Sequence, residues 1–178
     1  MPGTLTCESY SVWLMPEPDW AREFKRIVDD FAERFGTPQF IPHLTLIGGR
    51  PFDRVDLARR VSSLLPGSRA VWRPIVDVAL GASYFRSFYA LFGAEGALLG
   101  LKKRMDRAVL GVEATDFMPH VSLLYGEVEA GRKAAAAAEI RAKLSGQTVR
   151  FDRLEIVYSG DDVPVEDWET VEAFRLDG

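Results

Sequence analysis

The sequence predicts an α+β fold in which two similar lobes form one compact unit. Strand-like segments, rich in aromatic and β-branched residues, alternate with amphipathic helical segments. The segment Phe40–Gly49 is repeated at Phe117–Gly126, and each copy follows a strand and a helix. The chain of 178 residues is long enough to bury one sizeable core or two small, closely packed ones.

The first strand and helix are predicted from residue type and spacing. Aromatic and β-branched residues at Ser9–Met15 favour a strand, and the following Pro16 begins a turn. Asp19 is placed to cap a helix that runs to about Phe35, where Gly36 is a natural stop. The apolar residues of this helix recur at three- and four-residue intervals and therefore share one face: Phe24, Ile27, Val28 and Phe31.

The first half of the chain continues with a second strand and helix. The strand passes through His43 and reaches Ile47, after which Gly48-Gly49 and Pro51 are expected to break the chain. The pattern at Asp53–Leu65 predicts a second amphipathic helix, which Pro66-Gly67 closes.

The second half repeats this order after an extended segment at Arg73–Leu80. A strand is predicted at Ser87–Phe92, a helix at Glu95–Leu110 and another strand at Pro119–Tyr125. The last predicted elements are a helix at about Glu129–Leu144, which contains an alanine run, and strands at Val149–Tyr158 and Glu169–Leu176. The alanine run is typical of a surface helix.

The repeated segments indicate an internal duplication. Five of the ten aligned positions are identical, and most of the others are conservative. We place the two units at about 8–66 and 84–145 within a single domain covering 1–178. Two long copies are too few for a solenoid, so two lobes related by a pseudo-twofold axis are expected.

A histidine and a hydroxyl residue occupy the same places in both copies. Side chains alternate along a strand, so His43 and Thr45 face one way, and His120 and Ser122 do likewise. The apolar residues between them belong against helices. A pseudo-twofold axis would then bring two imidazoles and two hydroxyls together across a cleft.

This set of groups suits the attack of water on a cyclic phosphate. One imidazole can take a proton from water while the other gives a proton to the leaving ribose oxygen, because the usual histidine pKa is about 6.5. The hydroxyls of Thr45 and Ser122 can donate to the non-bridging oxygens, so we expect no metal and no cofactor. A single histidine at a strand end is usually structural. These two are the only histidines in the chain, and both lie beside a hydroxyl.

Composition narrows the class of protein. The formal charge of −4 is unusual for a protein that grips long nucleic acid and favours a small phosphorylated ligand. No apolar run approaches the roughly 20 residues of a membrane span, and Met1–Ser11 does not have the pattern of a secretory signal. Cys7 is the only cysteine. We therefore expect a cytoplasmic monomer that does not bind membranes.

The paired motifs resemble those of the two-histidine (2H) phosphoesterase superfamily, in its branch of small cyclic nucleotide phosphodiesterases typified by plant enzymes. The similarity covers nearly the whole chain and rests on these segments: Tyr10–Trp13, Phe40–Thr45, Met118–Tyr125 and Trp168–Val171. The resemblance implies a bilobal α+β fold whose two antiparallel sheets line a central cleft, with helices outside. It also implies hydrolysis of 2′,3′-cyclic nucleotides to nucleoside 2′-phosphates, and action on ADP-ribose 1″,2″-cyclic phosphate.

The resemblance assigns roles to individual residues. His43 and His120 match the catalytic pair, Thr45 and Ser122 the phosphate-binding hydroxyls, and Tyr125 a tyrosine that helps to hold the phosphate. An aromatic residue that stacks on a base is implied at Tyr84 or Phe85, although a core role for Phe85 remains open. Two tryptophans, Trp13 and Trp168, also match and are interpreted as packing residues.

Two other functions remain open. A relative acting on RNA ends, through 2′,3′-cyclic phosphates or 2′,5′ linkages, would share the same site and would be favoured by a basic rim of Arg50, Arg54 and Arg86. A module that binds cyclic phosphates without turnover is the other alternative. The sequence leaves open which histidine is the acid and which is the base.

Overall fold

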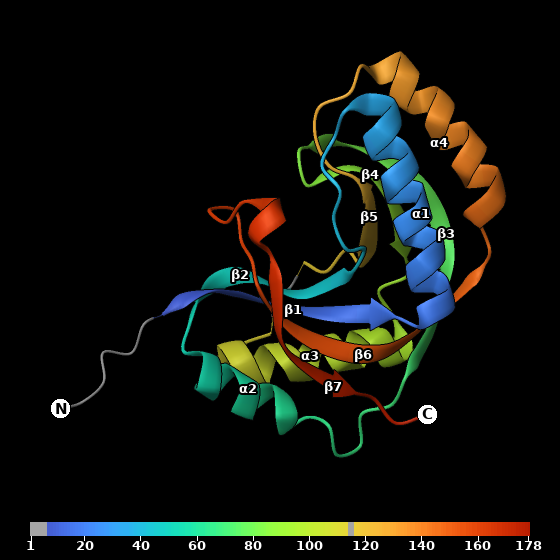
Figure 1. The fold of residues 1–178 in the computed structure, drawn as a ribbon. Helices are drawn as coiled ribbons and strands as arrows, with labels where there is room; N and C mark the ends of the chain where they lie inside the picture. The colour runs from blue at the N-terminus through green and yellow to red at the C-terminus, as the bar shows by residue number, and fades with distance from the viewer. Residues whose placement is uncertain (1–6, 114–115) are drawn as a thin grey trace.

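The computed structural model describes residues 7–113 and 116–178. Strands and helices alternate along most of the chain (Figure 1). They are β1 (Glu8–Pro16), α1 (Pro18–Phe35), β2 (Leu44–Phe52), α2 (Arg54–Ser62), β3 (Val71–Ser83), β4 (Arg86–Phe92), α3 (Gly96–Leu110), β5 (His120–Leu124), α4 (Ala130–Leu144), β6 (Thr148–Tyr158), a 3-10 turn (Val165–Asp167) and β7 (Glu169–Arg175). Among the helices so described, none is long and apolar enough to cross a membrane.

The strands form one antiparallel, seven-stranded sheet in the order β1-β2-β5-β4-β3-β6-β7, with a further pairing of β1 with β6. The long pairings divide it into two groups, β3-β4-β5 and β2-β1-β6-β7. The groups join where Leu44 of β2 pairs with Val121 of β5, and where Val71–Pro74 pairs with the start of β6. The predicted antiparallel α+β fold is confirmed, and its two sheets are joined into one.

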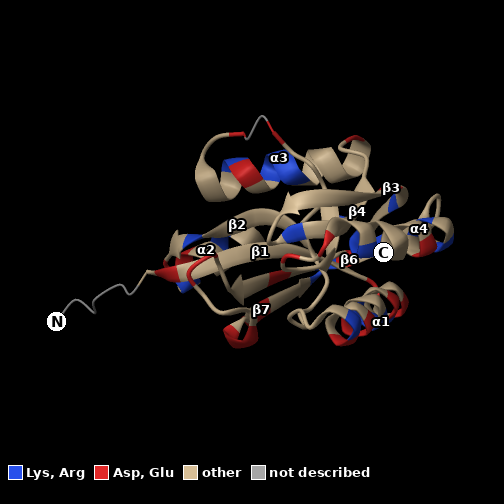
Figure 2. Ribbon diagram, turned by 90° about the horizontal axis from the view of Figure 1, so that it is seen from above, with Lys and Arg blue, Asp and Glu red and all other residues tan. Residues whose placement is uncertain are grey.

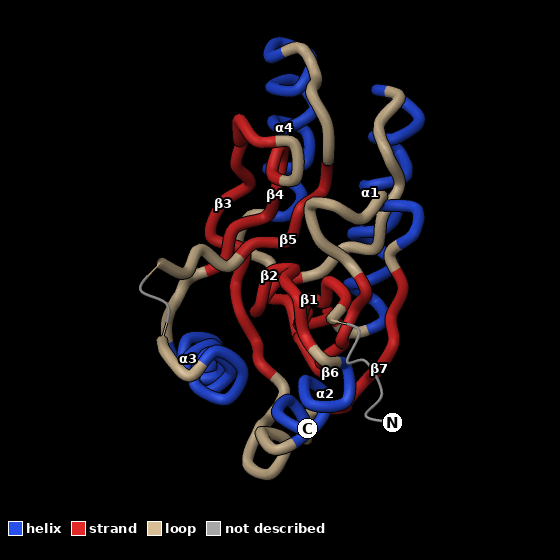
Figure 3. The backbone as a smooth tube through the Cα atoms, turned by 90° about the vertical axis from the view of Figure 1, so that its left-hand side faces the viewer, coloured by secondary structure: helices blue, strands red, loops and turns tan. Residues whose placement is uncertain are grey.

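Helices pack on the outside of the strands in two pairs. Helices α1 and α4 lie together over β3, β4 and β5, whereas α2 and α3 lie together at the β2 end (Figures 1 and 3). Helix α1 therefore covers strands from the second half of the chain, and α3 contacts β2 from the first half. Phe31 of α1 packs against Phe88 of β4 with ring centroids 5.4 Å apart. Charged residues of both signs lie on α1, α3 and α4 (Figure 2).

Helix ends follow the sequence signals with two exceptions, at the start of α1 and at the end of α2. Gly36 ends α1 in the left-handed conformation at φ 69°, and the Asp53 side chain caps α2. The prediction that Asp19 caps α1 is wrong, because the helix already begins at Pro18, after Glu17. Proline suits the first helical position, since its missing N–H needs no partner there. Helix α2 also ends three residues earlier than predicted, at Ser62.

The predicted chain break after Ile47 is also wrong, because β2 continues through Phe52. Pro51 pairs with Ser9 of β1. Since β2 pairs with β5 only at Leu44, Pro51 lies where a missing N–H costs no ladder hydrogen bond on the open side. At Gly49, a Cβ would lie 2.5 Å from Gly160 Cα, so glycine allows this strand to pass close to the chain after β6. The extended segment predicted near Arg73 is strand β3.

Candidate active site

The pairing of β2 with β5 brings the two repeated motifs side by side. Leu44 pairs with Val121 in an antiparallel register. Continuing that register by one residue in each direction places His43 beside Ser122 and Thr45 beside His120. Leu44 and Val121 are fully buried in the core, so by strand alternation the two histidines and two hydroxyl residues share the opposite face.

That face forms part of a cavity of about 180 Å³ between the two groups of strands. All five residues assigned to the site from sequence line it: His43, Thr45, His120, Ser122 and Tyr125. The other lining residues are Ser11, Trp13, Gly48, Gly49, Phe85, Ser159, Gly160, Asp161 and Trp168. A larger hollow of about 1040 Å³ runs along α1 and includes none of the predicted site residues.

Each histidine is oriented by a backbone carbonyl two residues before it. His43 Nδ1 lies 2.7 Å from the Ile41 carbonyl oxygen, and His120 Nδ1 lies 2.8 Å from that of Met118. Because a carbonyl oxygen only accepts, Nδ1 must carry the hydrogen in both rings. The Nε2 atom of each imidazole is therefore the one left to exchange a proton.

His43 is held in an apolar, aromatic setting. Its imidazole stacks on the indole of Trp13, with centroids 3.4 Å apart and planes 5° from parallel. Its exposed fraction is 7 %. Burial lowers the pKa of His43 to about 3, against a smaller opposing effect of the hydrogen bond to Ile41. His43 is therefore neutral in the empty site at neutral pH.

His120 lies in a more open setting. It is half-buried, and the ring of Tyr89 meets it edge-on at 5.3 Å. Burial lowers the pKa of His120, and the positive charge of Arg86 lowers it further, while the hydrogen bond to Met118 opposes both. The two imidazoles of the site thus differ in exposure and in their charged neighbours.

The two hydroxyls differ in how they are used. Ser122 Oγ donates to the Phe85 carbonyl oxygen at 2.8 Å, which ties β5 to the turn between β3 and β4. Among the described residues, Thr45 has no hydrogen-bond partner for its hydroxyl. Thr45 can donate to a ligand directly, whereas Ser122 must first turn away from Phe85.

Tyr125 completes the predicted set. Its ring stacks on Phe40 at 3.6 Å and 13°, and only 3 % of the residue is exposed. Burial raises the pKa of Tyr125, so its hydroxyl stays protonated at neutral pH. It can therefore act as a hydrogen-bond donor to an anion in the cavity.

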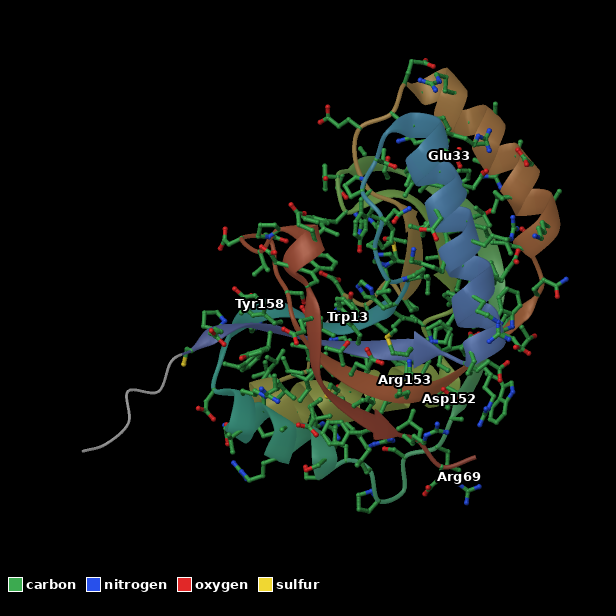
Figure 4. The ribbon with its side chains drawn as sticks, viewed as in Figure 1. Trp13, Glu33, Arg69, Asp152, Arg153 and Tyr158 are labelled. Atoms are coloured by element: carbon green, nitrogen blue, oxygen red, sulfur yellow. The ribbon has the colours of Figure 1, made fainter. Side chains whose placement is uncertain are left out.

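Two of the residues that line the cavity, Trp13 and Trp168, were predicted from the sequence to be packing residues. Trp13 projects from β1 at the centre of the molecule, where Figure 4 labels it, and forms the stacking surface for His43. Trp168 meets both His43 and Tyr125 edge-on, at 6.1 Å and 6.0 Å, and its Nε1 donates to the Val163 carbonyl. Trp13 pairs with Thr45 across β1 and β2, a register that the sequence alone does not give.

The two aromatic residues at the β3–β4 turn lie at two neighbouring hollows, and Phe85 lines both of them. Phe85 lines the cavity, where its ring stacks on Trp168 at 6.0 Å. Tyr84, with an exposed fraction of 44 %, lines an adjoining cavity of about 320 Å³. Both residues can therefore contact a part of a bound ligand that extends out of the cavity on this side.

A second polar surface of the cavity was not predicted from the sequence. Ser11 and Ser159 are buried, both line the cavity, and Ser159 Oγ donates to Ser11 Oγ at 2.9 Å. The residues come from β1 and from the end of β6, which are distant in sequence. No sequence motif marks this pair, since isolated serines are common on strands.

The three arginines of the predicted basic rim lie in different places. Of these, Arg86 lines a groove next to His120, whereas the Arg54 guanidinium donates to the Val171 carbonyl. Neither Arg50 nor Arg54 lines the cavity or that groove.

Within 7–113 and 116–178, no group of three or more His, Cys, Asp or Glu side chains is arranged to hold a metal ion.

Comparison with known proteins identifies similar chains. A family model described as "cyclic phosphodiesterase-like protein" matches residues 8–176. The cyclic phosphodiesterase of Arabidopsis thaliana is 26% identical over 171 residues, which are 94% of this chain and 94% of that protein. Both similarities span nearly all of the elements described above.

Solved structures share the fold at low sequence identity. The protein TT0787 of Thermus thermophilus has a TM-score of 0.64 and 17% identity, covering 96% of this chain and 98% of that one. LigT of Escherichia coli, solved in complex with 3′-AMP, has a TM-score of 0.57 and 12% identity, with the same shares covered, 96% and 98%. These likenesses establish the fold of the chain.

Proposed function

The chain belongs to the cyclic phosphodiesterase-like protein family, and we propose that it hydrolyses 2′,3′-cyclic nucleotides to nucleoside 2′-phosphates without a metal ion. We include ADP-ribose 1″,2″-cyclic phosphate among its candidate substrates. The observation that carries the proposal is the β2–β5 pairing, because it gathers two histidines and two hydroxyls on one cavity wall. The Arabidopsis relative, a cyclic phosphodiesterase, supports the same class of substrate.

The proposed reaction needs one neutral and one protonated imidazole. The neutral Nε2 takes a proton from water, whose oxygen attacks phosphorus, and the bond from phosphorus to the ribose 3′ oxygen breaks. The protonated Nε2 of the other histidine gives its proton to that leaving oxygen. The product keeps its phosphate on the 2′ oxygen, and the two histidines exchange protonation states.

We assign the base to His43 and the acid to His120. The deeply buried His43, with its pKa lowered to about 3, is neutral throughout the physiological range and is ready to accept a proton. His120 is the more exposed of the two and can take a proton from solvent when the negatively charged substrate binds beside it.

The hydroxyls stabilise the charge that develops on the phosphate. Thr45 and Tyr125 can each donate a hydrogen bond to a non-bridging oxygen, and Ser122 can join them once it leaves the Phe85 carbonyl. Among the described residues that line the cavity, none is a Lys or Arg, so neutral donors and the histidinium must balance this charge.

The direct test is turnover of the four 2′,3′-cyclic nucleotides and ADP-ribose 1″,2″-cyclic phosphate in EDTA, with the product identified by phosphorus NMR. We expect a nucleoside 2′-phosphate with metal removed. A 3′-phosphate product would overturn the assignment of the leaving oxygen. Turnover of none of these, but of RNA ending in a 2′,3′-cyclic phosphate, would favour the RNA-end function; binding without any turnover would indicate a binding module.

Substitutions test the roles of the four central residues. We expect His43→Ala and His120→Ala to lose several orders of magnitude in turnover while the protein stays folded, since each removes a proton-transfer group. Thr45→Ala and Ser122→Ala should lose less, on the order of 10- to 1000-fold. Circular dichroism provides the folding control. Near-normal turnover in both histidine variants would exclude the mechanism.

A further inference from the structure

The cavity adjoins two hollows of opposite character. On the side of Phe85 and Asp161, it adjoins the small cavity that also contains Tyr84, Asp162 and Glu166, so this side is aromatic and acidic. On the side of His120, it adjoins a groove of about 650 Å³ that shares Thr45, Gly48 and His120 with it. The other residues of this groove are Leu46, Arg86, Lys102, Asp116, Phe117 and Met118.

Arg86 supplies the available positive charge of this groove. It begins β4, it is exposed, and it forms no ion pair with any residue that the structure describes. Its guanidinium lies 6.0 Å from the centroid of Tyr89, the ring that meets His120 edge-on. Arg86 and His120 line the same groove, and the positive charge of Arg86 lowers the pKa of His120.

The other charged residues of the groove do not replace it. Lys102 is buried, is paired with Asp106 of the same helix, and lies over the Phe117 ring at 5.5 Å. Asp116 also lines the groove and, among the described residues that line it, is the one carboxylate that opposes an anion there. An anion bound next to His120 therefore has Arg86 as its natural partner.

The substrate is larger than the cavity, so a charged residue outside the cavity can contact it. A cavity of about 180 Å³ holds a cyclic phosphate with part of its ribose and leaves the base and the 5′ carbon to extend outside. A base can stack near Tyr84 and Phe85, whereas a second phosphate would meet repulsion from Asp161, Asp162 and Glu166 on that side. The groove at Arg86 is the side that suits a second negative group.

We propose that the groove beside His120 is a second phosphate subsite and that Arg86 is the residue that makes the enzyme prefer cyclic phosphates with a further phosphate on the 5′ oxygen of the same ribose. This inference rests on the proposed cyclic phosphodiesterase function. It adds to that function a specificity-determining residue outside the reaction cavity. The guanidinium binds the second phosphate through charge-assisted hydrogen bonds.

The test compares two substrates that differ only in the second phosphate: adenosine 2′,3′-cyclic phosphate with and without a 5′-phosphate. We expect the unmodified protein to prefer the 5′-phosphorylated substrate in kcat/KM by about 3- to 10-fold, mainly through KM, because exposed ion pairs are individually modest. Higher salt should reduce this preference. Arg86→Gln should bring it close to unity, and Arg86→Lys should restore part of it.

Arg50→Gln is the matched control, because it removes the same charge from β2 at a position that lines neither the cavity nor the groove. It should keep the preference. The ratio of two substrates on one variant also cancels any change in His120, whose pKa should rise when Arg86 is removed. A ratio of one in the unmodified protein, or a preference that survives in Arg86→Gln, overturns the proposal.

Failure of the proposed function gives a different result. If neither substrate is turned over, the phosphodiesterase assignment fails, while calorimetric binding of the same two compounds still decides the subsite. Tighter binding of the 5′-phosphorylated compound that is lost in Arg86→Gln supports it. Equal binding of the two compounds rejects it.

Discussion

At the scale of single residues, the environment of His43 links acid stability to the candidate site. The folded protein keeps this imidazole neutral, with a pKa of about 3, whereas the unfolded chain takes up a proton near pH 6.5. As pH falls from 6.5 toward 3, the unfolded state therefore binds more protons than the folded state. The stability that the neutral imidazole provides at pH 7 is lost across this range.

His43→Gln should consequently make the protein less sensitive to acid. Between pH 7 and pH 4 the free energy of unfolding of the original protein should fall by on the order of 3 kcal/mol more than that of the variant. Urea titrations at the two pH values measure this difference. An equal fall in both proteins would show that His43 is not held neutral on folding.

The sequence predicted the candidate site residues better than the residues that contact them. The repeated motif and the alternation of side chains along a strand are local properties, and they pointed to His43, His120, Thr45, Ser122 and Tyr125. The stacking of Trp13 on His43 and the Ser11–Ser159 hydrogen bond depend on pairing of β1 with β2 and β6, which joins segments far apart in the chain. Nothing in the local pattern specifies that register.

At the scale of elements, strand β2 shows why its two glycines are not equivalent. A Cβ at Gly49 would lie 2.5 Å from Gly160 Cα and 2.6 Å from the Ser159 carbonyl oxygen, both backbone atoms that cannot move independently. At Gly48, no heavy atom lies within 4 Å of the same position. Both glycines read as a chain break in the sequence, yet only one of them is required by close packing.

Gly49→Ala should therefore destabilise the protein by about 1–3 kcal/mol, because the backbone after β6 must shift. Gly48→Ala is the control and should change the free energy of unfolding by about 0.5 kcal/mol or less. Thermal and urea unfolding of the two variants provide the comparison. Equal stability of the two would mean that the close approach of β2 to Gly160 is absent in solution.

Element boundaries were predicted well where a local signal sets them. Gly36 ends α1 at the predicted residue, and α2 begins at Arg54, one residue after the predicted start. The errors at Asp19 and at Pro51 have a common cause, since both residues have propensities that a neighbouring feature overrides. At α1 that feature is Pro18 in the first turn; at β2 it is the pairing with β1.

At the scale of the whole molecule, helices and strands of the two halves are interleaved. Helix α1 lies on β5, and α3 lies on β2, so each half of the chain buries apolar surface that belongs to the other. The predicted repeat units at 8–66 and 84–145 remain a hypothesis about an internal duplication of the sequence. They do not correspond to two cores that are separate in space, because one apolar cluster contains residues of both units.

We therefore expect a single cooperative unfolding transition. Circular dichroism of the helices and tryptophan fluorescence should change at the same urea concentration. The fluorescence comes from four tryptophans, of which Trp13 and Trp168 line the candidate site, and the dichroism comes mainly from α1, α2, α3 and α4. Two separated transitions would contradict the shared core.

The two groups of strands join at only two short pairings, and this has a mechanical consequence. One is Leu44 with Val121, and the other is Val71–Pro74 with the start of β6. If the groups rock slightly about the axis through these two junctions, atoms near that axis move least. The candidate site residues His43, Thr45, His120 and Ser122 flank the first junction, so their spacing would stay nearly constant while the adjoining cavity at Tyr84 widens for a bulkier group.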